Sequence, residues 1–251
     1  MTIVVNANYQ QFESQLASIE QVFDDSEVTL QAGRNHIKSA NIGDEKVVIK
    51  SFKRLGVVRG FIYRFLRKSK ARRAYEYAEN LLSLGFNTPF PIAYIERGSA
   101  VGVTSSFFVS SHFDHDFEIR AVLDNKVANS DQILEQFVKF SFDLHNAGVL
   151  HLDHSPGNTL VKKAKDGGYK FALIDINRMQ FRPLSTRERL ENLSRLSDED
   201  DIVRKFASHY AALASLDEEI CFQTIKNAAT KRFKALNSRK ALKKKLGLKK
   251  S

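Results

Sequence analysis

The chain has 251 residues, a length that fits one large domain or two small lobes with a shared cleft. Hydrophobic residues make up 43% of it, which supports a packed core and excludes a disordered protein. The single cysteine, Cys221, excludes an intramolecular disulfide and any metal site built from several cysteines. It also fits a reducing compartment.

The formal net charge of +10 is concentrated at the end of the chain. Residues 231–251 hold ten of the 39 basic residues and no acidic one, so the remainder carries 29 basic against 29 acidic residues. A local basic tail favours docking to an anionic surface, here a membrane surface. Nucleic acid is disfavoured, because the body of the chain has no basic face that would extend the patch. A solvated tail without a partner is the alternative.

The N-terminal residues carry no recognisable targeting signal. Residues 1–8 contain neither a basic stretch nor a long apolar one, so a secretory signal is not expected. No run in the chain reaches the ~18 apolar residues of a membrane-spanning helix. We therefore expect a cytoplasmic protein that is soluble or held on a membrane surface.

Apolar spacing predicts a helix followed by short strands in the N-terminal part. Residues 8–23 carry apolar side chains at three- and four-residue intervals, which indicates one helix. Strand-like segments follow at 28–30, 37–40 and 47–49, with glycine-containing turns between them. This order predicts an antiparallel meander.

The next segment is predicted to be helical and then to return to strands. Residues 57–84 form a helix in two pieces with a basic face, ending at Gly85. Two strands follow, at 92–95 and 101–109, around a turn at 97–99. The chain becomes polar at 112–116, and we place a lobe boundary there.

The second half is predicted to be mainly helical. One helix carries its apolar face up to Gly148, a hairpin pairs residues 160–161 with 169–174, and helices continue from Thr186. The expected fold class is α+β. Its parts are an antiparallel N-lobe at 1–112, a helical C-lobe at 113–230 and the basic tail at 231–251.

The clearest functional pattern is H-x-D-x-x-x-x-N, followed by an apolar strand that ends in aspartate. The pattern is formed by His151, Asp153 and Asn158, and the later aspartate is Asp175. Phosphotransferases of the protein-kinase-like fold use this spacing around a nucleoside triphosphate. Asp153 is the predicted general base for the attacking hydroxyl. Asn158 and Asp175 are the predicted Mg²⁺ ligands. An ordinary polar loop is the alternative interpretation.

Three further residues are candidates for ATP binding. Lys50 ends an apolar strand, as in the V-A-I-K pattern, whose lysine contacts the α- and β-phosphates. Glu76 is our candidate to hold Lys50 from the following helix, and Glu79, one turn later, is its competitor. Gly33 lies in the turn where a phosphate-covering loop is expected, although the segment is not G-x-G-x-x-G.

Several histidines are expected to be structural. His112 to Asp116 has the composition of a metal site, but a polar linker between lobes is the favoured interpretation. His145 and His151 flank a turn before the predicted catalytic loop. We expect them to brace this loop by hydrogen bonds.

With these motifs the chain resembles the lipopolysaccharide kinase family, which includes the Kdo and heptose kinases of bacteria. The resemblance is carried by residues 144–153, 155–158 and 174–178, and it extends over 27–185 with a basic segment at 67–74. It implies a kinase-like bilobal fold that uses ATP and Mg²⁺, and a sugar hydroxyl as acceptor. By position it implies Asp153 as base, Asn158 and Asp175 as metal ligands, and Lys50 as the phosphate-binding lysine.

The chain also departs from the protein kinases. Ile176 and Asn177 stand where Phe-Gly would follow the metal-binding aspartate, no A-P-E motif follows, and Ser155 replaces a lysine. These differences favour a glycolipid or other small acceptor over a peptide. We therefore expect a kinase of the lipopolysaccharide inner core on the cytoplasmic face of the inner membrane. The basic tail and the aromatic, basic segment 57–68 would contact the membrane. A kinase of another small molecule or protein, and a catalytically silent membrane-binding module, are the alternatives.

Overall fold

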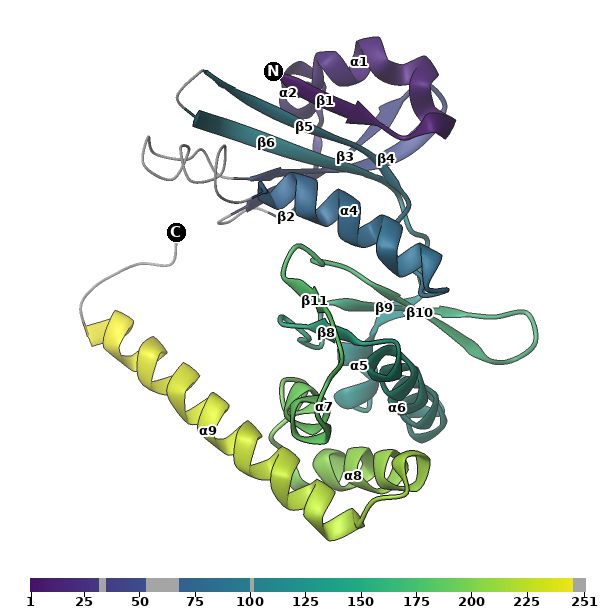
Figure 1. The fold of residues 1–251 in the computed structure, drawn as a ribbon, viewed down its shortest axis with the longest axis vertical. Helices are drawn as coiled ribbons and strands as arrows, with labels where there is room; N and C mark the ends of the chain where they lie inside the picture. Colours follow the sequence, from purple (N-terminus) through teal and green to yellow (C-terminus); the bar gives the residue numbers. More distant parts are fainter. Residues whose placement is uncertain (32–34, 53–67, 100–101, 246–251) are drawn as a thin grey trace. The chain divides into compact units, whose positions relative to one another are not determined.

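The computed structural model describes residues 1–31, 35–52, 68–99 and 102–245. The chain divides into two compact units, unit 1 from Met1 to Asp114 and unit 2 from His115 onward. Figure 1 labels the elements of both units. Each unit is described by itself.

Unit 1 is built on an antiparallel sheet. Among the described residues, six strands pair in the order β1-β5-β6-β4-β3-β2. Their bounds are β1 Thr2–Val5, β2 Val28–Gln31, β3 Asn35–Ile42, β4 Glu45–Phe52, β5 Pro91–Ser99 and β6 Gly102–Ser111. The predicted meander is confirmed in β2, β3 and β4, whereas β1, a strand at the sheet edge, was not predicted.

The turn predicted at 97–99 is wrong, because these residues belong to β5 and Ser99 pairs with Gly102. The register shifts between Arg97 and Gly98, as at a β-bulge. A Cβ atom on Gly98 would lie 2.2 Å from the Gly102 carbonyl oxygen. The glycine therefore allows the two backbones of the hairpin to approach closely. It does not mark the point at which the chain reverses direction, as the sequence pattern had suggested.

The single helix predicted at 8–23 is also wrong. The segment forms three short helices, η1 (Ala7–Phe12), α1 (Glu13–Ala17) and α2 (Ile19–Asp25). Ser18, with φ −100° and ψ 27°, interrupts the helical path between α1 and α2. Leu16 and Ile19 on either side of it are fully buried against the sheet. Packing of both side chains into the same core thus overrides helical continuity.

Helix α4 (Lys70–Ser83) covers the other face of this sheet (Figure 1). It begins after Ser69, whose hydroxyl accepts a hydrogen bond from the Arg72 backbone N–H at 3.1 Å. It ends as predicted at Gly85, which has a φ of +84° that favours glycine. The first part of the predicted helical segment, residues 57–67, lies outside the described residues.

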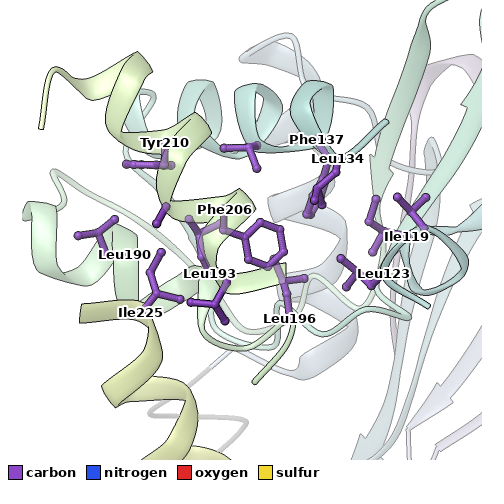
Figure 2. Packing of buried hydrophobic residues seen from close by; sticks show 14 of the residues in the cluster. Ile119, Leu123, Leu134, Phe137, Leu190, Leu193, Leu196, Phe206, Tyr210 and Ile225 are labelled. Atoms are coloured by element: carbon purple, nitrogen blue, oxygen red, sulfur yellow. The ribbon is translucent and has the colours of Figure 1, made fainter. Parts of the chain in front are cut away.

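Unit 2 is mainly helical, as predicted. Its helices are α5 (Ile119–Leu123), α6 (Ser130–Asn146), α7 (Thr186–Leu193), α8 (Asp200–Ala214) and α9 (Glu218–Lys245). Figure 2 shows the core that they share, in which Phe137 and Phe206 are fully buried. Burial of each such aromatic side chain contributes roughly 1.5–3 kcal/mol to folding. This core fixes α6 and α7, which lie on either side of the segment with the candidate site in the sequence.

Short strands complete unit 2 and flank the predicted catalytic loop. They are β7 (Phe117–Glu118), β8 (Val149–His151), β9 (Thr159–Lys163), β10 (Tyr169–Leu173) and β11 (Met179–Phe181). The hairpin of β9 and β10 was predicted, and β7 adds to it. The pair β8–β11 was not predicted, because three residues are too short for a periodic signal.

The basic tail predicted to start at residue 231 has no structural boundary there. Helix α9 runs through this position to Lys245, so the first cations of the tail lie on a helix that packs against α7 and α8. Residues 246–251 lie outside the described residues. Within the described part of the chain, no helix is both long and apolar enough to cross a membrane.

Candidate active site

Asp153 lies on the turn that follows β8, and the surrounding backbone fixes this turn. Gly148, with φ +73°, joins α6 to β8, and its carbonyl accepts a hydrogen bond from Arg182 N–H at 2.8 Å. A Cβ at Gly148 would lie 2.8 Å from the Arg182 carbonyl oxygen. Glycine is therefore required where the chain after β11 crosses the start of β8.

Hydrogen bonds join the segments that carry Asp153, Asn158 and Asp175. The Asn158 side chain donates from Nδ2 to the Asp153 carbonyl at 2.7 Å. The Ile174 N–H donates to the Asn158 carbonyl at 3.0 Å, so the end of β10 is held beside the loop. Hydrogen bonds within unit 2 thus join the loop that carries Asp153 and Asn158 to Ile174, the residue immediately before Asp175.

The carboxylate of Asp153 forms an ion pair with Arg178. The Arg178 Nη1 lies 2.9 Å from Asp153 Oδ2, and the two side chains are 58% and 32% exposed. An ion pair this exposed contributes at most about 1 kcal/mol to stability. Its consequence is geometric, because the guanidinium restricts the orientation of the predicted base.

His151 is held in one neutral tautomer by two backbone contacts. Its Nδ1 lies 3.1 Å from the Asp153 N–H, which can only donate. Its Nε2 lies 3.0 Å from the Ile174 carbonyl, which can only accept. Nδ1 is therefore the acceptor and Nε2 carries the proton. The ring links the start of the loop to the end of β10, as expected for a bracing histidine.

Asn192 of α7 joins this arrangement to two more histidines. Its Nδ2 donates to the His151 carbonyl at 3.0 Å, which fixes the orientation of the amide. Its Oδ1 therefore accepts from His145 Nε2 at 3.2 Å and from His154 Nδ1 at 3.1 Å. The Nδ1 of His145 then accepts from the Tyr210 hydroxyl at 3.0 Å. We call these five residues the histidine network.

Burial keeps the three imidazoles neutral. It lowers the pKa of His145 to about 4, although the hydrogen bond that His145 donates to Asn192 acts in the opposite direction. Burial also lowers the pKa of His151 and lowers that of His154 well below its ordinary value. Burial raises the pKa of Tyr210 to about 12. The expectation that His145 and His151 brace the loop is confirmed.

Asp175 adopts an unusual backbone conformation directly after β10. Its φ is +54°, in the left-handed region that few residues other than glycine adopt. The Asn177 side chain, which is buried, donates from Nδ2 to Asp175 Oδ1 at 2.7 Å. Asn177 thus stabilises the turn and orients the carboxylate. This contact gives a physical role to the residue that replaces the glycine of protein kinases.

Asn158 and Asp175 carry oxygen atoms of the type that binds Mg²⁺. Because Nδ2 of Asn158 donates to the loop, its Oδ1 is the remaining atom, and it has no hydrogen-bond partner among the described residues. Mg²⁺ prefers oxygen ligands and is held by one or two protein groups together with phosphates and water. The described residues contain no group of three or more His, Cys, Asp or Glu that would hold a metal alone.

Lys50 lies on β4 of unit 1, on the face of the sheet covered by α4. The preceding residue, Ile49, enters the core with α1 and α2, and successive side chains of a strand point to opposite faces. Lys50 pairs in register with Phe108 of β6, which in turn pairs with Tyr94 of β5. The ring centroid of Tyr94 lies 5.4 Å from that of Tyr75 on α4. The Lys50 Nζ lies 5.6 Å from the Phe52 ring centroid.

Glu76 of α4 accepts from Lys68 at 2.7 Å and from Arg72 at 2.9 Å. Burial raises its pKa, but these hydrogen bonds outweigh burial and the pKa lies below its ordinary value. Glu79 is exposed and interacts with Tyr75. The pairing of Glu76 with Lys50 stays a prediction, as does the choice of Glu76 over Glu79.

Two other predicted features have different outcomes. Gly33 and nearly all of the aromatic, basic segment 57–68 lie outside the described residues. In the segment 112–116, Asp116 Oδ2 accepts from the Lys163 N–H at 2.7 Å, and its own N–H donates to the Val161 carbonyl. Asp116 thus fixes the start of unit 2 to β9, which agrees with a polar linker.

Sequence reasoning missed several residues around the loop. Arg178 was part of the noted segment but had no role, and Asn192 and Tyr210 were not singled out. The one signal that could have indicated a polar network is an asparagine beside the apolar positions of a predicted helix, as Asn192 is beside Leu193. The three-residue spacing from Asp175 to Arg178 carries no signal of its own.

Comparisons with known proteins now identify the relationship. The profile of the Lipopolysaccharide kinase (Kdo/WaaP) family matches residues 44–210, about two thirds of the chain. The solved structure "WaaP in complex with acyl carrier protein" is similar, with a TM-score of 0.65 and 19% sequence identity. The match covers 92% of this chain and 99% of that one.

At this identity the likeness shows the fold, which is protein-kinase-like, with an antiparallel N-terminal sheet and a helical C-terminal part. The comparison with curated proteins found no match. The family profile covers β4, α4 and the whole H-x-D segment with Asp175. The chain therefore belongs to the Lipopolysaccharide kinase (Kdo/WaaP) family.

Proposed function

We propose that the protein is an ATP-dependent kinase that phosphorylates a sugar hydroxyl of the lipopolysaccharide inner core, on Kdo or heptose. The observation that carries the proposal is the hydrogen-bonded arrangement of Asp153, Asn158 and the end of β10 before Asp175. Membership of a lipopolysaccharide kinase family supports the reaction class and the use of ATP.

Asp153 is the proposed general base. A third of its side chain is exposed, so a hydroxyl group has access to it, while Arg178 holds one of its oxygens. Transfer of the phosphoryl group needs positioning and charge neutralisation more than covalent chemistry from the protein. Asp153 would accept the proton of the acceptor hydroxyl as its oxygen bonds to the γ-phosphorus, while the bond from this phosphorus to the β,γ-bridging oxygen breaks and ADP leaves.

Asn158 and Asp175 are the proposed Mg²⁺ ligands. A bound ion would neutralise charge on the phosphates, which is the chemistry that it supplies in such enzymes. Asn177 would keep the Asp175 carboxylate oriented. Lys50 is the proposed contact to the α- and β-phosphates, held by Glu76, and Gly33 is proposed to cover the nucleotide.

A glycolipid acceptor is supported by the departures from protein kinases. Ser155 stands in place of the lysine, and its backbone N–H donates to the Asp153 carbonyl at 2.6 Å. The H-x-D segment, residues 151–158, contains no lysine, and Ile176 and Asn177 replace the Phe-Gly that follows the metal-binding aspartate of protein kinases. The acceptor would be presented at an anionic membrane surface.

The membrane contact is proposed for the C-terminal half of α9 and the residues after it. Each cation close to an anionic leaflet contributes about 1 kcal/mol to binding, so several together hold a protein reversibly. Flotation with vesicles of anionic and of zwitterionic lipid tests this contact. Selective binding to anionic vesicles, reduced by changing Lys243, Lys244 and Lys245 to Gln, is expected; equal binding to both vesicles would contradict it.

The central experiment incubates the purified protein with Kdo-lipid A, ATP and Mg²⁺. Transfer of the γ-phosphate to the sugar is expected, with no transfer when Mg²⁺ is chelated. Absence of transfer to this acceptor and to heptose-containing cores would refute the substrate. Nucleotide binding without transfer to any acceptor would favour a silent binding module instead.

Acyl carrier protein is a second candidate partner, because the WaaP structure was solved in complex with it. Co-expression followed by size-exclusion chromatography tests this association. Co-elution at equal stoichiometry would support it, and separate elution at micromolar concentration would argue against it.

A further inference from the structure

A groove in unit 2 lies next to the H-x-D segment. Its volume is about 1250 Å³, and its walls come from β8, β11, α7 and α9, which Figure 1 labels. Leu152, the neighbour of Asp153, lines it, as does Asn192 of the histidine network. A molecule bound in this groove therefore lies within unit 2 next to the H-x-D segment.

The charges that line the groove are unbalanced. Five cations face two carboxylates, and both carboxylates are already paired. Arg182 pairs with Glu188 at 2.5 Å, and Arg187 pairs with Glu191 at 2.7 Å. The remaining three cations have no hydrogen-bonded or ion-paired side-chain partner within the described part of the chain; they are Arg195, Lys231 and Arg232.

Arg195 and Arg232 lie close enough to influence each other. Half-burial lowers the pKa of Arg195, and the guanidinium of Arg232 lowers it further, while Asp153 acts in the opposite direction. Two like charges near each other and partly removed from water destabilise a fold unless a counter-charge is present. Asp153 is already paired with Arg178, so it cannot balance both groups.

Guanidinium groups suit one class of ligand in particular. Their planar donor geometry matches the oxygens of a phosphate or a carboxylate, often with two parallel hydrogen bonds. The groove also has an apolar rim, where Ile220 and Leu236 are 67% and 37% exposed. An amphiphile with an anionic sugar headgroup has both properties.

We propose that Arg195 and Arg232 bind an anionic group of the acceptor, a phosphate or a carboxylate, and so position the acceptor hydroxyl at Asp153. The proposal rests on the proposed kinase function and assigns the acceptor side of that site. Lys231, which also lines the groove, adds positive charge without the planar donor geometry.

The test compares Arg195→Gln, Arg232→Gln and the double variant with the unchanged protein. KM is measured for Kdo-lipid A and for ATP. Loss of one charge-assisted contact should raise the KM for Kdo-lipid A by roughly 10-fold to 100-fold, with a KM for ATP within about twofold. Should Arg195→Gln fail to fold, Arg195→Lys and Arg232→Gln supply the same comparison.

Arg187→Gln is the matched control. It removes one positive charge from the same groove, but from a group that Glu191 already neutralises. A control KM for Kdo-lipid A within about twofold of the unchanged protein supports a specific site. An equal rise in the control, an unchanged acceptor KM in the double variant, or a rise in the ATP KM alone would overturn the proposal.

Two acceptors distinguish the anion. If the arginines bind a phosphate, removing the lipid A phosphates from Kdo-lipid A should raise its KM with the unchanged protein. This KM should then equal that of intact Kdo-lipid A with the double variant. If the Kdo carboxylate is bound, the stripped acceptor should keep the full sensitivity to both substitutions. Either pattern supports the site.

An equilibrium measurement separates this proposal from the kinase function. Binding of Kdo-lipid A to Asp153→Asn is compared with binding to the same variant carrying both arginine substitutions. If the two arginine substitutions weaken binding of Kdo-lipid A by about 10-fold or more, the proposed site is supported. If the unchanged protein nevertheless transfers no phosphate, the kinase function is refuted and the site is not. Equal binding, or none to either variant, would refute the site.

Discussion

The two sides of the H-x-D segment, residues 151–158, have opposite character. On one side, His151 and His154 are fully buried and neutral, and Asn192 ties them to α6 and α7. On the other side, Asp153 is partly exposed and faces the guanidinium of Arg178. The two histidines on the buried side carry no charge, whereas the exposed side carries the ion pair of Asp153 with Arg178.

This difference separates positioning from chemistry. Neutral groups such as His145 and His151, whose two ring nitrogens both have partners, hold a loop rigidly at any pH near neutrality. Charged groups on a partly wet surface remain available to a substrate. Substitutions on the buried side should therefore change stability first, whereas substitutions on the exposed side should change activity with little effect on stability.

The largest expected effect comes from the exposed side, in Asp153→Asn. Loss of the general base should reduce kcat by roughly 10²–10⁴. The free energy of unfolding should change by less than about 1 kcal/mol, because the ion pair with Arg178 that is lost is exposed and the shape of the side chain is kept. Steady-state kinetics and urea unfolding measure the two quantities.

Asp166→Asn, in the turn between β9 and β10, is the control for this substitution and should keep full activity. Unchanged turnover in Asp153→Asn would remove Asp153 from the role of base.

Asn192→Leu should break the buried side. His145 and His154 lose their acceptor, and the His151 carbonyl loses its donor. Unsatisfied buried polar groups each cost about 1–3 kcal/mol, so we expect about 3 kcal/mol or more to be lost from the free energy of unfolding. Urea unfolding followed by circular dichroism measures this loss.

Asn227→Leu is the matched control, since Asn227 lines the groove but is exposed. It should change stability by less than about 0.5 kcal/mol. Equal effects of the two substitutions would show that the histidine network does not stabilise the fold.

The third prediction is that the free energy of unfolding falls when the pH is lowered, because of the buried histidines. The pKa of His145 is lowered from 6.5 to about 4 by burial, so between these values the unfolded chain binds a proton that the folded protein does not. The stability present above pH 6.5 should thus fall as the pH decreases to 4. The contribution of His145 to this fall is about 3 kcal/mol.

Urea unfolding at several pH values between 7 and 4 measures the slope. In His145→Gln the slope should be smaller, because glutamine does not titrate. The same slope in both proteins would contradict a neutral, buried His145.

Arg178→Gln should have the smallest effect of the four. Without the guanidinium, Asp153 is free to rotate, and we expect kcat to fall about tenfold through misalignment. Stability should change by less than about 1 kcal/mol, because the pair is exposed. Arg178→Lys should recover part of the rate, and an unchanged kcat in Arg178→Gln would show that the pair does not orient the base.

Prediction from the sequence succeeded where a signal is local and repeated. The apolar face of α6, the hairpin of β9 and β10, and the meander of β2, β3 and β4 all follow from periodicity or turn residues. It failed for β1, β8 and β11, strands of three or four residues whose pairing partners lie far away in the chain. It also failed at Ser18, where core packing interrupts a helix.

The candidate site divides in the same way. The spacing of Asp153, Asn158 and Asp175 and the bracing role of His145 and His151 could be inferred from the sequence, because chemistry constrains residue types at short separations. Asn192 and Tyr210 could not, since they join the loop from α7 and α8. Nor could the presence of Arg195 and Arg232 in one groove be inferred, since they are 37 residues apart in the chain.

The sequence by itself thus determined the fold class, the family resemblance and the residues proposed for chemistry. The tertiary structure alone decided which histidines are neutral, which guanidinium pairs with Asp153, and which cations in the groove lack a partner. The physical reason is that protonation and charge pairing depend on burial and on contacts across tens of residues. Periodicity and spacing describe only the local path of the chain.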